Sequence, residues 1–238
     1  MMFEGIIYEL DGLMVDTELT HVRAWGECLQ KLKVEPNENL LLDLLGKRTF
    51  DIADFLRHRY NLPISPMEVH ESWHEIFMQL IEESLEPKQG LIESLQMFKD
   101  YEFKLAIICT GPRDYLYYVL EKLGLDEAFD VIVAGDMVQQ SYPDPTFHIA
   151  CGETFALHPS SVLSLTCRRD GVEAATNAAM KSICIPGYHT PRWRAMGASL
   201  VLSNLGELNL SIIRSLWTEP NSDFGPRPQP QLFPHRNR

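Results

Sequence analysis

The stretch GIIYELDGLMVDTE, residues 5–18, decides the fold, because a short apolar run leads directly into an acidic turn. The run at 5–8 does not alternate between apolar and polar residues and carries branched side chains, which predicts a buried parallel strand. Glu9 and Asp11 follow this strand, two residues apart, and Gly12 comes directly after them. In open α/β sheets ligands bind beyond the carboxyl ends of the strands, so this turn is a candidate functional site.

Further apolar runs with the same character predict the other strands of a sheet. They lie at 104–110, 130–135, 161–167, 182–186 and 199–204. Stretches of helical periodicity separate several of them, at 113–125, 145–157 and 170–180. Gly124 is expected to end the first of these helices, and Pro145 opens the second. This alternation predicts a doubly wound α/β fold with a parallel, Rossmann-like sheet.

The segment 16–86 interrupts the alternation, because it has much helical periodicity and no strand signal. It predicts a helical cap subdomain inserted after the first strand. The α/β core then comprises residues 1–15 and 87–217, and a helix near 87–103 leads back into the sheet.

The final segment, 218–238, contains five prolines and few apolar residues. This composition predicts a disordered or polyproline-like tail. A docking segment for a protein partner is the open alternative, because Phe224, Leu232 and Phe233 could serve as anchors.

The composition of the chain disfavours several classes of protein. The net charge of −12 argues against non-specific nucleic-acid binding, which needs a basic surface. The five cysteines are scattered without a CxxC pair, which disfavours a zinc site and indicates a reduced environment. No apolar run approaches the ~20 residues needed to span a bilayer, so we expect no transmembrane segment. We expect a cytoplasmic protein, or one in an organelle lumen or stroma after removal of a transit segment.

An acidic turn at the end of a strand suits phosphoryl transfer through a carboxylate. That chemistry needs a carboxylate nucleophile and a second carboxyl group that moves a proton. A cation, usually Mg²⁺ held by oxygen ligands, must neutralise the transferring group. Hydroxyl and backbone donors must hold the phosphate oxygens.

Four motifs carry residues of these kinds. They are ELDG with VDTE at 9–18, IICTGPR at 107–113, SYPDP at 141–145 and LTCRRDGVEAA at 165–175. In their flanks and order they resemble the motifs of the haloacid dehalogenase superfamily, in its branch of β-phosphoglucomutase-like phosphatases. The resemblance covers about residues 2–210 and implies an α/β core with a helical cap.

The chain departs from the family pattern where the chemistry resides. Glu9 stands where the family has a nucleophilic Asp, and its extra methylene displaces the carboxylate by roughly 1 Å, which is costly in rate. Tyr142 replaces the family's Lys. Thr166 and Cys167 replace acidic metal ligands, and a hydroxyl and a soft thiol are poor ligands for Mg²⁺. Arg168 replaces a small Ser.

The resemblance assigns the candidate site residues by position. The catalytic positions of the family are, in this chain, Glu9, Asp11, Thr110 and Tyr142. The positions that would bind a ligand or phosphate are Thr110, Gly111, Lys47, Arg48 and Arg168. The metal positions are Glu9, Asp11, Thr166 and Cys167, and with these residues we expect no bound metal.

Charge supports this expectation. The family site sums to −3, which calls for a divalent ion, whereas Glu9, Asp11 and Arg168 together carry −1. We therefore hypothesise that Arg168 pairs with Glu9 or Asp11 in the place of the metal.

Several residues leave two interpretations open. Glu9 is either a slow nucleophile or a carboxylate left in an inactive site, and Tyr142 either fills the space of the lost Lys or stacks on a ligand. Cys167 is either an inert buried thiol or a redox sensor beside Arg168. Asp170 either supports the loop or rescues metal binding.

The sequence therefore favours a catalytically inactive, haloacid dehalogenase-like pseudoenzyme that serves as a binding, regulatory or structural subunit of a larger assembly. The alternative is a Mg²⁺-dependent phosphatase or phosphosugar mutase with altered or residual activity on a small phosphorylated metabolite. An intermediate hypothesis is a sensor that binds such a metabolite without turnover. No cofactor is expected, except Mg²⁺ under the alternative.

Overall fold

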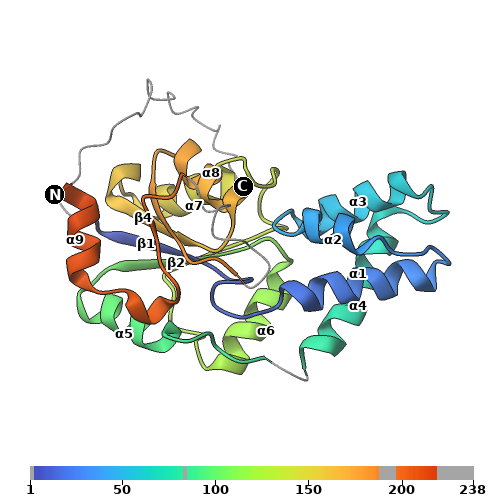
Figure 1. The fold of residues 1–238 in the computed structure, drawn as a ribbon, viewed down its shortest axis with the longest axis horizontal. Helices are drawn as coiled ribbons and strands as arrows, with labels where there is room; N and C mark the ends of the chain where they lie inside the picture. Colours follow the sequence, from blue (N-terminus) through green and yellow to red (C-terminus); the bar gives the residue numbers. More distant parts are fainter. Residues whose placement is uncertain (1–2, 83–84, 188–196, 219–238) are drawn as a thin grey trace, which may run out of the picture.

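The computed structural model describes residues 3–82, 85–187 and 197–218, and within them a parallel sheet forms the centre of the molecule (Figure 1). Its strands are β1 (Gly5–Glu9), β2 (Lys104–Cys109), β3 (Val131–Ala134), β4 (Val162–Thr166), β5 (Lys181–Cys184) and β6 (Leu200–Val201). They lie in the order β3-β2-β1-β4-β5-β6, and every neighbouring pair is parallel. The predicted α/β fold is confirmed. From β1 the chain first adds β2 and β3 on one side and then β4, β5 and β6 on the other, and ligands bind at such a switch point in folds of this kind.

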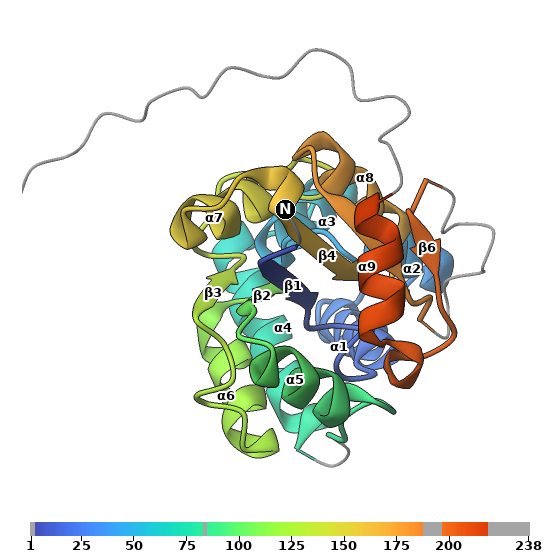
Figure 2. The same cartoon turned by 90° about the vertical axis from the view of Figure 1, so that its left-hand side faces the viewer.

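The strands bury both of their faces. Ile6 and Tyr8 belong to the larger hydrophobic core, whereas Ile7 between them belongs to the smaller one on the opposite face. Helices α5 (Leu91–Asp100), α6 (Arg113–Leu123) and α9 (Leu210–Thr218) cover the first face, and α7 (Thr146–Phe155) and α8 (Arg169–Asn177) cover the second (Figure 2). Burial on both sides explains why the strands read as continuous apolar runs.

Most predicted element boundaries are close to the observed ones. Gly124 ends α6 as expected, with a left-handed φ of 66° that glycine adopts without strain. The strand predicted at 199–204 is too long, because only Leu200–Val201 pairs with β5.

Helix α9 was not predicted. Ile213 and Leu216 hold it in the core, and the ring of Trp217 packs edge-on against Phe3 at 5.1 Å. Short 3₁₀ turns, η1 (Pro159–Ser161) and η3 (Leu205–Glu207), precede β4 and α9.

Four helices between β1 and α5 form the cap, which projects beyond the carboxyl ends of the strands (Figure 1). They are α1 (Glu18–Lys31), α2 (Glu38–Leu44), α3 (Thr49–Arg59) and α4 (Pro66–Ile81). A capping box between Ser65 and Glu68 starts α4. The cap has its own aromatic core, in which Trp25 stacks on Trp73 at 4.8 Å.

The two connections between core and cap lie side by side. Val15 forms isolated β-bridges with Asp11 before it and with Pro87 on the returning chain. Lys88 also donates from Nζ to the carbonyl oxygen of Gly12 at 2.7 Å. The turn after β1 is therefore tied to the returning chain, which fixes the acidic residues relative to the cap. The exact division into core and cap stays a prediction.

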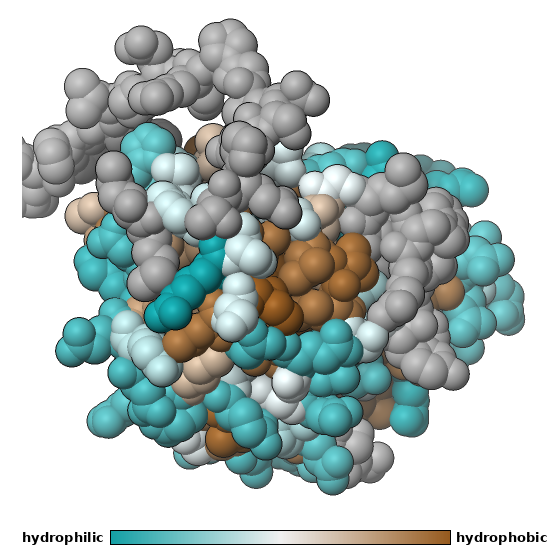
Figure 3. All heavy atoms as spheres, turned by 60° about the vertical axis from the view of Figure 1, so that its left-hand side comes forward, coloured by the Kyte–Doolittle hydropathy of each residue, from teal (hydrophilic) through white to brown (hydrophobic). Residues whose placement is uncertain are grey.

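The face that carries α9 has hydrophobic side chains gathered in one area, bordered by hydrophilic residues (Figure 3). The tail predicted at 218–238 starts one residue too early, because Thr218 is the last residue of α9. Its other residues, 219–238, lie outside the described residues, so its docking role stays a prediction. Among the helices of the described ranges, none combines the length and the hydrophobicity that crossing a membrane requires.

Candidate functional site

A cavity of about 20 Å³ lies between the carboxyl ends of the strands and the cap, which is room for about one water molecule. Its wall consists of Glu9, Asp11, Glu18, His21, Trp25, Leu45, Gly46, Lys47, Thr49, Ile52, Thr110 and Arg168. The fold thus brings together five residues singled out from the sequence, namely Glu9, Asp11, Thr110, Lys47 and Arg168. Five others do not line the cavity, namely Arg48, Gly111, Tyr142, Thr166 and Cys167.

Glu9 ends β1 and is almost completely buried, with 5% of its surface exposed. Its Oε2 accepts hydrogen bonds from the Thr166 hydroxyl at 2.6 Å and from the Cys167 backbone N–H at 3.0 Å. Burial raises the pKa of Glu9 to about 7, because loss of solvation outweighs these hydrogen bonds and the charge of Arg168. At neutral pH the carboxyl group is therefore divided between its protonated and ionised forms.

Asp11 is surrounded by donors. Its Oδ1 accepts from the hydroxyls of Thr17 and Tyr115, both at 2.6 Å, and lies 3.1 Å from His21 Nε2. The Cys109 thiol lies 3.7 Å from Oδ2. Burial alone would raise the pKa of Asp11, but the charge of His21 and the hydrogen bonds from His21, Thr17 and Tyr115 outweigh it and lower the pKa below its ordinary value. Asp11 is held as a carboxylate, which makes it a weak proton donor.

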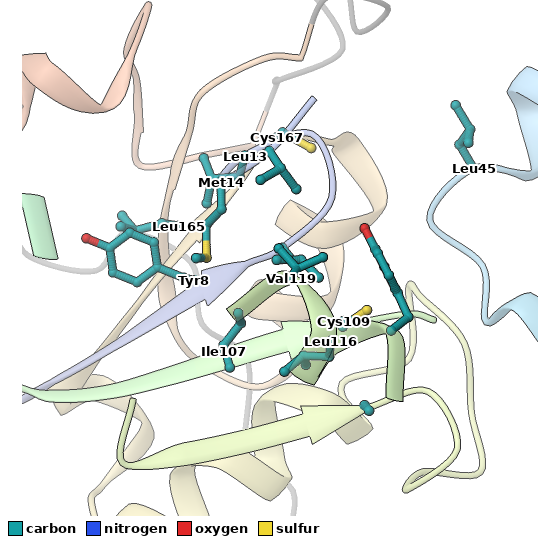
Figure 4. Packing of buried hydrophobic residues seen from close by; sticks show 14 of the residues in the cluster. Tyr8, Leu13, Met14, Leu45, Ile107, Cys109, Leu116, Val119, Leu165 and Cys167 are labelled. Atoms are coloured by element: carbon teal, nitrogen blue, oxygen red, sulfur yellow. The ribbon is translucent and has the colours of Figure 1, made fainter. Parts of the chain in front are cut away.

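The two thiols near Asp11 are inert. Cys109 and Cys167 lie at the ends of their strands, on the side that faces Leu45 of the cap (Figure 4). Burial is the main cause that raises the pKa of each well above its ordinary value. The Cys167 thiol donates to the Asp11 carbonyl oxygen at 3.3 Å. A buried, protonated thiol agrees with the interpretation of Cys167 as a structural residue rather than a redox sensor.

The residues at the family's metal positions do not fit Mg²⁺. The Thr166 hydroxyl donates a hydrogen bond to Glu9, and Cys167 offers a protonated sulfur, whereas Mg²⁺ favours carboxylate, carbonyl and water oxygens. Glu9 Oε2 is already engaged by two donors. In the described ranges, no group of three or more His, Cys, Asp or Glu side chains is placed to hold a metal ion.

Arg168 has partners other than those hypothesised. Its Nη1 lies 3.3 Å from Glu18 Oε1, and its Nε lies 3.3 Å from Asp170 Oδ1. The hypothesis that it pairs directly with Glu9 or Asp11 is wrong, because the first turns of α1 and α8 bring Glu18 and Asp170 nearer to the guanidinium. Burial alone would lower the pKa of Arg168, but Asp170 and the other nearby acidic groups raise it. Asp170 is thereby used as a partner of Arg168.

The side chain of Tyr142 is a buried part of the second core. It is 2% exposed, and its ring packs against Phe147 at 5.3 Å and against His148 at 5.9 Å. The pKa of Tyr142 is raised well above its ordinary value, first by burial and then by the charge of Glu9. This agrees with the interpretation of Tyr142 as a filler of space, since its ring does not line the cavity.

Lys47 and Arg48 contact the core rather than open solvent. Lys47 Nζ donates to the Tyr142 carbonyl oxygen. Arg48 donates from Nε to Gly135 O at 2.9 Å and from Nη1 to Gln139 O at 2.5 Å. Arg48 therefore fastens the cap to the core, whereas Lys47 also lines the cavity.

Thr110 lines the cavity at the end of β2, and its carbonyl oxygen accepts from the backbone N–H of Thr49 in the cap at 3.2 Å. The N–H of Gly111 lies 3.3 Å from Cys109 Sγ. Thr110 is thus in place to contact a ligand, while the Gly111 N–H is already used within the core.

The sequence did not predict five residues that contact Asp11 or Arg168, namely Thr17, Glu18, His21, Cys109 and Tyr115. Two of them could have been predicted from the sequence. Thr17 and Glu18 complete the VDTE motif, and side chains just beyond a catalytic turn can fold back on it. His21 and Tyr115 reach Asp11 from α1 and α6, so their role depends on how these helices pack.

Comparisons with known proteins show the family of this chain. Residues 6–185 match the family described as haloacid dehalogenase-like hydrolase. Protein CbbY of Cereibacter sphaeroides is 28% identical over 219 residues, which cover 87% of this chain and 94% of the relative. A phosphorylated carbohydrates phosphatase of Thermotoga maritima is 27% identical over 184 residues, which cover 76% of this chain and 83% of the relative.

Solved structures show the same fold. The crystal structure of CbbY from Rhodobacter sphaeroides in complex with phosphate superposes with a TM-score of 0.79 at 27% identity, covering 90% of this chain and 100% of that one. A β-phosphoglucomutase from Clostridium difficile superposes with a TM-score of 0.80 at 21% identity, covering 91% and 97% of the two chains.

Proposed function

Because this chain belongs to the family of haloacid dehalogenase-like hydrolases, we propose that it keeps the family's ligand cleft but not its metal-dependent chemistry. In this proposal the protein is a pseudoenzyme that binds a small phosphorylated metabolite between core and cap. It then acts as a binding, regulatory or structural subunit.

The observation that carries the proposal is the hydrogen bonding of Glu9. At the position of the family's nucleophile, one carboxylate oxygen is held by Thr166 and by the Cys167 backbone N–H. These donors engage Oε2 and leave Oε1, and because the pKa of Glu9 is raised to about 7, the carboxyl group is only partly ionised at neutral pH, which weakens it as a nucleophile. The nucleophile, the metal ligands and the lysine act as a unit in this chemistry, so their joint replacement removes more than any single change would.

The ligand class is proposed from the relatives and from the cavity wall. The CbbY structure is described as a complex with phosphate, and the Thermotoga protein is named for phosphorylated carbohydrates. In this chain Thr110 and Lys47 supply a hydroxyl and an ammonium group to the same cavity. These groups suit the oxygen atoms of a phosphate.

A second candidate function is a phosphatase or phosphosugar mutase with residual activity. The relatives support it better than they support inactivity, since they include a named phosphatase and none of them indicates a loss of catalysis. Family members typically use Mg²⁺, whereas the Thr166 hydroxyl, which is hydrogen-bonded to Glu9, and the protonated Cys167 thiol are poor Mg²⁺ ligands and favour the first candidate.

An activity assay separates the two candidates. Wild type and Glu9→Gln are assayed with p-nitrophenyl phosphate and a panel of phosphosugars in the presence of Mg²⁺. The proposal expects equal, background rates from both proteins. Turnover by wild type that Glu9→Gln abolishes would establish the second candidate instead.

The proposed role in an assembly has a separate test. Protein comprising residues 1–238 and protein lacking 219–238 are compared for the partners that they retain from a lysate. Partners lost with the tail support the docking role, and an unchanged set removes the tail from the proposal.

A further inference from the structure

Two histidines lie one turn apart on the cap helix α4, where this helix meets the core. The rings of His70 and His74 are stacked, with their centroids 6.3 Å apart and an interplanar angle of 7°. His74 Nε2 lies 3.0 Å from Asp114 Oδ2, in the first turn of the core helix α6. This pair joins α4 directly to the core, so the two histidines lie at the junction between core and cap.

His70 contacts a second point at which the cap is joined to the core. Its Nε2 lies 2.9 Å from the hydroxyl oxygen of Thr49, the first residue of α3. The backbone N–H of the same Thr49 donates to the carbonyl oxygen of Thr110, just after β2, at 3.2 Å. Because Thr49 is buried, the ring of His70 packs against a residue whose backbone holds the cap closed on the core.

The ring of His70 is enclosed mainly by uncharged groups. Phe50 of α3 and Trp73 of α4 lie beside it, with ring centroids 6.0 and 5.4 Å away. The Thr49 hydroxyl can donate or accept a hydrogen bond, so it serves the neutral and the charged ring alike. Burial therefore decides the charge, and it is the main cause that lowers the pKa of His70 to about 4. In the closed cap the ring remains neutral well below neutral pH.

The charged groups that face His70 come from its own helix and from the core. A charge on His74 lowers the pKa of His70 further, whereas Asp114 of α6 and Asp136 after β3 raise it by less than burial lowers it. Each carboxylate also has another partner, since Asp114 pairs with His74 and Asp136 pairs with Arg113 at 3.3 Å. A proton on His70 is therefore unfavourable while α4 lies against the core.

We propose that His70 is a pH sensor of the cap and that acid favours an open cap. When α3 and α4 move away from the core, solvent reaches the His70 ring, which then takes up a proton that the closed cap disfavours. A proton that binds the open state better than the closed state shifts the population toward the open state. Opening breaks the hydrogen bond between Thr49 and Thr110 and uncovers the cavity at the carboxyl ends of the strands. This response of the cap does not depend on which of the two candidate functions is correct.

Hydrogen exchange of the Thr49 amide tests the inference on protein comprising residues 1–238. The exchange rate is divided by the intrinsic rate of an unfolded chain at each pH, so that only opening is compared. His70→Gln keeps a group that can hydrogen-bond to Thr49 but does not titrate. With a pKa of 6.5 in the open cap and about 4 in the closed one, wild type should gain about tenfold more opening than His70→Gln between roughly pH 7.5 and pH 5.5. Other titrating groups cancel in this difference.

Two further variants separate His70 from its neighbours. His58→Gln is the matched control, because His58 lies on α3 with 62% of its side chain exposed, and it should keep the pH dependence of wild type. His74→Gln removes the pair with Asp114, so it should increase opening at both pH values and still respond to acid. Thermal melting at neutral pH establishes that each variant is folded.

Several results would overturn the inference. One is an equal response to acid in wild type and His70→Gln, and another is a response that disappears in His74→Gln but persists in His70→Gln. An equal loss in His58→Gln and His70→Gln would indicate a general effect of charge. Titration of the His70 ring by NMR in the wild-type protein is a second measurement, and ionisation at the ordinary pKa of histidine would overturn the inference even if no variant folds. None of these results alters the assays of the proposed function.

Discussion

The Tyr115 hydroxyl donates a hydrogen bond to Asp11 Oδ1 at 2.6 Å, which links the first helix after β2 to the acidic turn after β1. This contact is one of three that hold the Asp11 carboxylate as an acceptor, together with those from Thr17 and His21. It makes the turn a stabilising element of the fold, whatever its remaining chemistry.

Tyr115→Phe should therefore lower stability. Loss of a hydrogen bond to a buried carboxylate is expected to reduce the free energy of unfolding by about 1–3 kcal/mol. Urea denaturation measures the difference. Tyr117→Phe is the control, because Tyr117 lies on the same helix with 50% of its surface exposed. Equal stability of the two variants would mean that the Asp11 contact contributes nothing.

Glu9 should make stability depend on pH. Its pKa is raised from 4.5 to about 7 in the folded protein, so between these values the folded state binds more protons than the unfolded state. The contribution of Glu9 to the free energy of unfolding therefore decreases as pH rises through this window, and it is lowest above pH 7. Between pH 5 and pH 8, the stability of Glu9→Gln relative to wild type should increase by about 1–3 kcal/mol.

Urea denaturation of both proteins at the two pH values checks this, since other titrating groups cancel in the difference. Glu93→Gln, at an exposed position of α5, should show no such trend. A difference between Glu9→Gln and wild type that is independent of pH would contradict the raised pKa of Glu9.

Arg168→Met should leave Glu18 as an uncompensated buried charge, since the Glu18 side chain is only 2% exposed. Breaking a buried ion pair from one side is expected to cost about 3–5 kcal/mol. Adding Glu18→Gln to Arg168→Met should recover part of the loss. Arg169→Met is the control, because Arg169 is 64% exposed and its pair with Glu173 is a surface contact. A similar small effect of both arginine replacements would show that Arg168 does not neutralise the site.

Arg48→Met should loosen the cap. The side chain donates to Gly135 and Gln139 across the cleft, and the neighbouring Thr49 N–H is bonded to the core. We expect the Thr49 amide to exchange its hydrogen about tenfold faster or more, because local opening exposes it. Arg59→Met, at the other end of α3, is the control and should leave this amide protected. Unchanged exchange in Arg48→Met would mean that other contacts fasten the cap.

The sequence was sufficient for the sheet because buried parallel strands leave long apolar runs, as at 104–110 and 161–167. It also predicted that Glu9, Asp11 and Thr110 lie close together, because the carboxyl ends of neighbouring parallel strands share one edge of a sheet. In the structure all three line one cavity. It could not supply the partners of Arg168. Glu18 lies 150 residues away in the chain, and only the packing of the cap on the core brings it near. For the same reason, the donors to Asp11 from α1 and α6 were not foreseen.

We propose that the residues at the family's metal positions do not form a Mg²⁺ site. Calorimetric titration of the wild-type protein with Mg²⁺ tests it most directly. The variant that combines Glu9→Asp, Tyr142→Lys, Thr166→Glu and Cys167→Asp is the positive control and should gain binding. We predict that wild type shows no sub-millimolar binding of Mg²⁺, and sub-millimolar binding by wild type would mean that Glu9, Asp11, Thr166 and Cys167 still form a metal site.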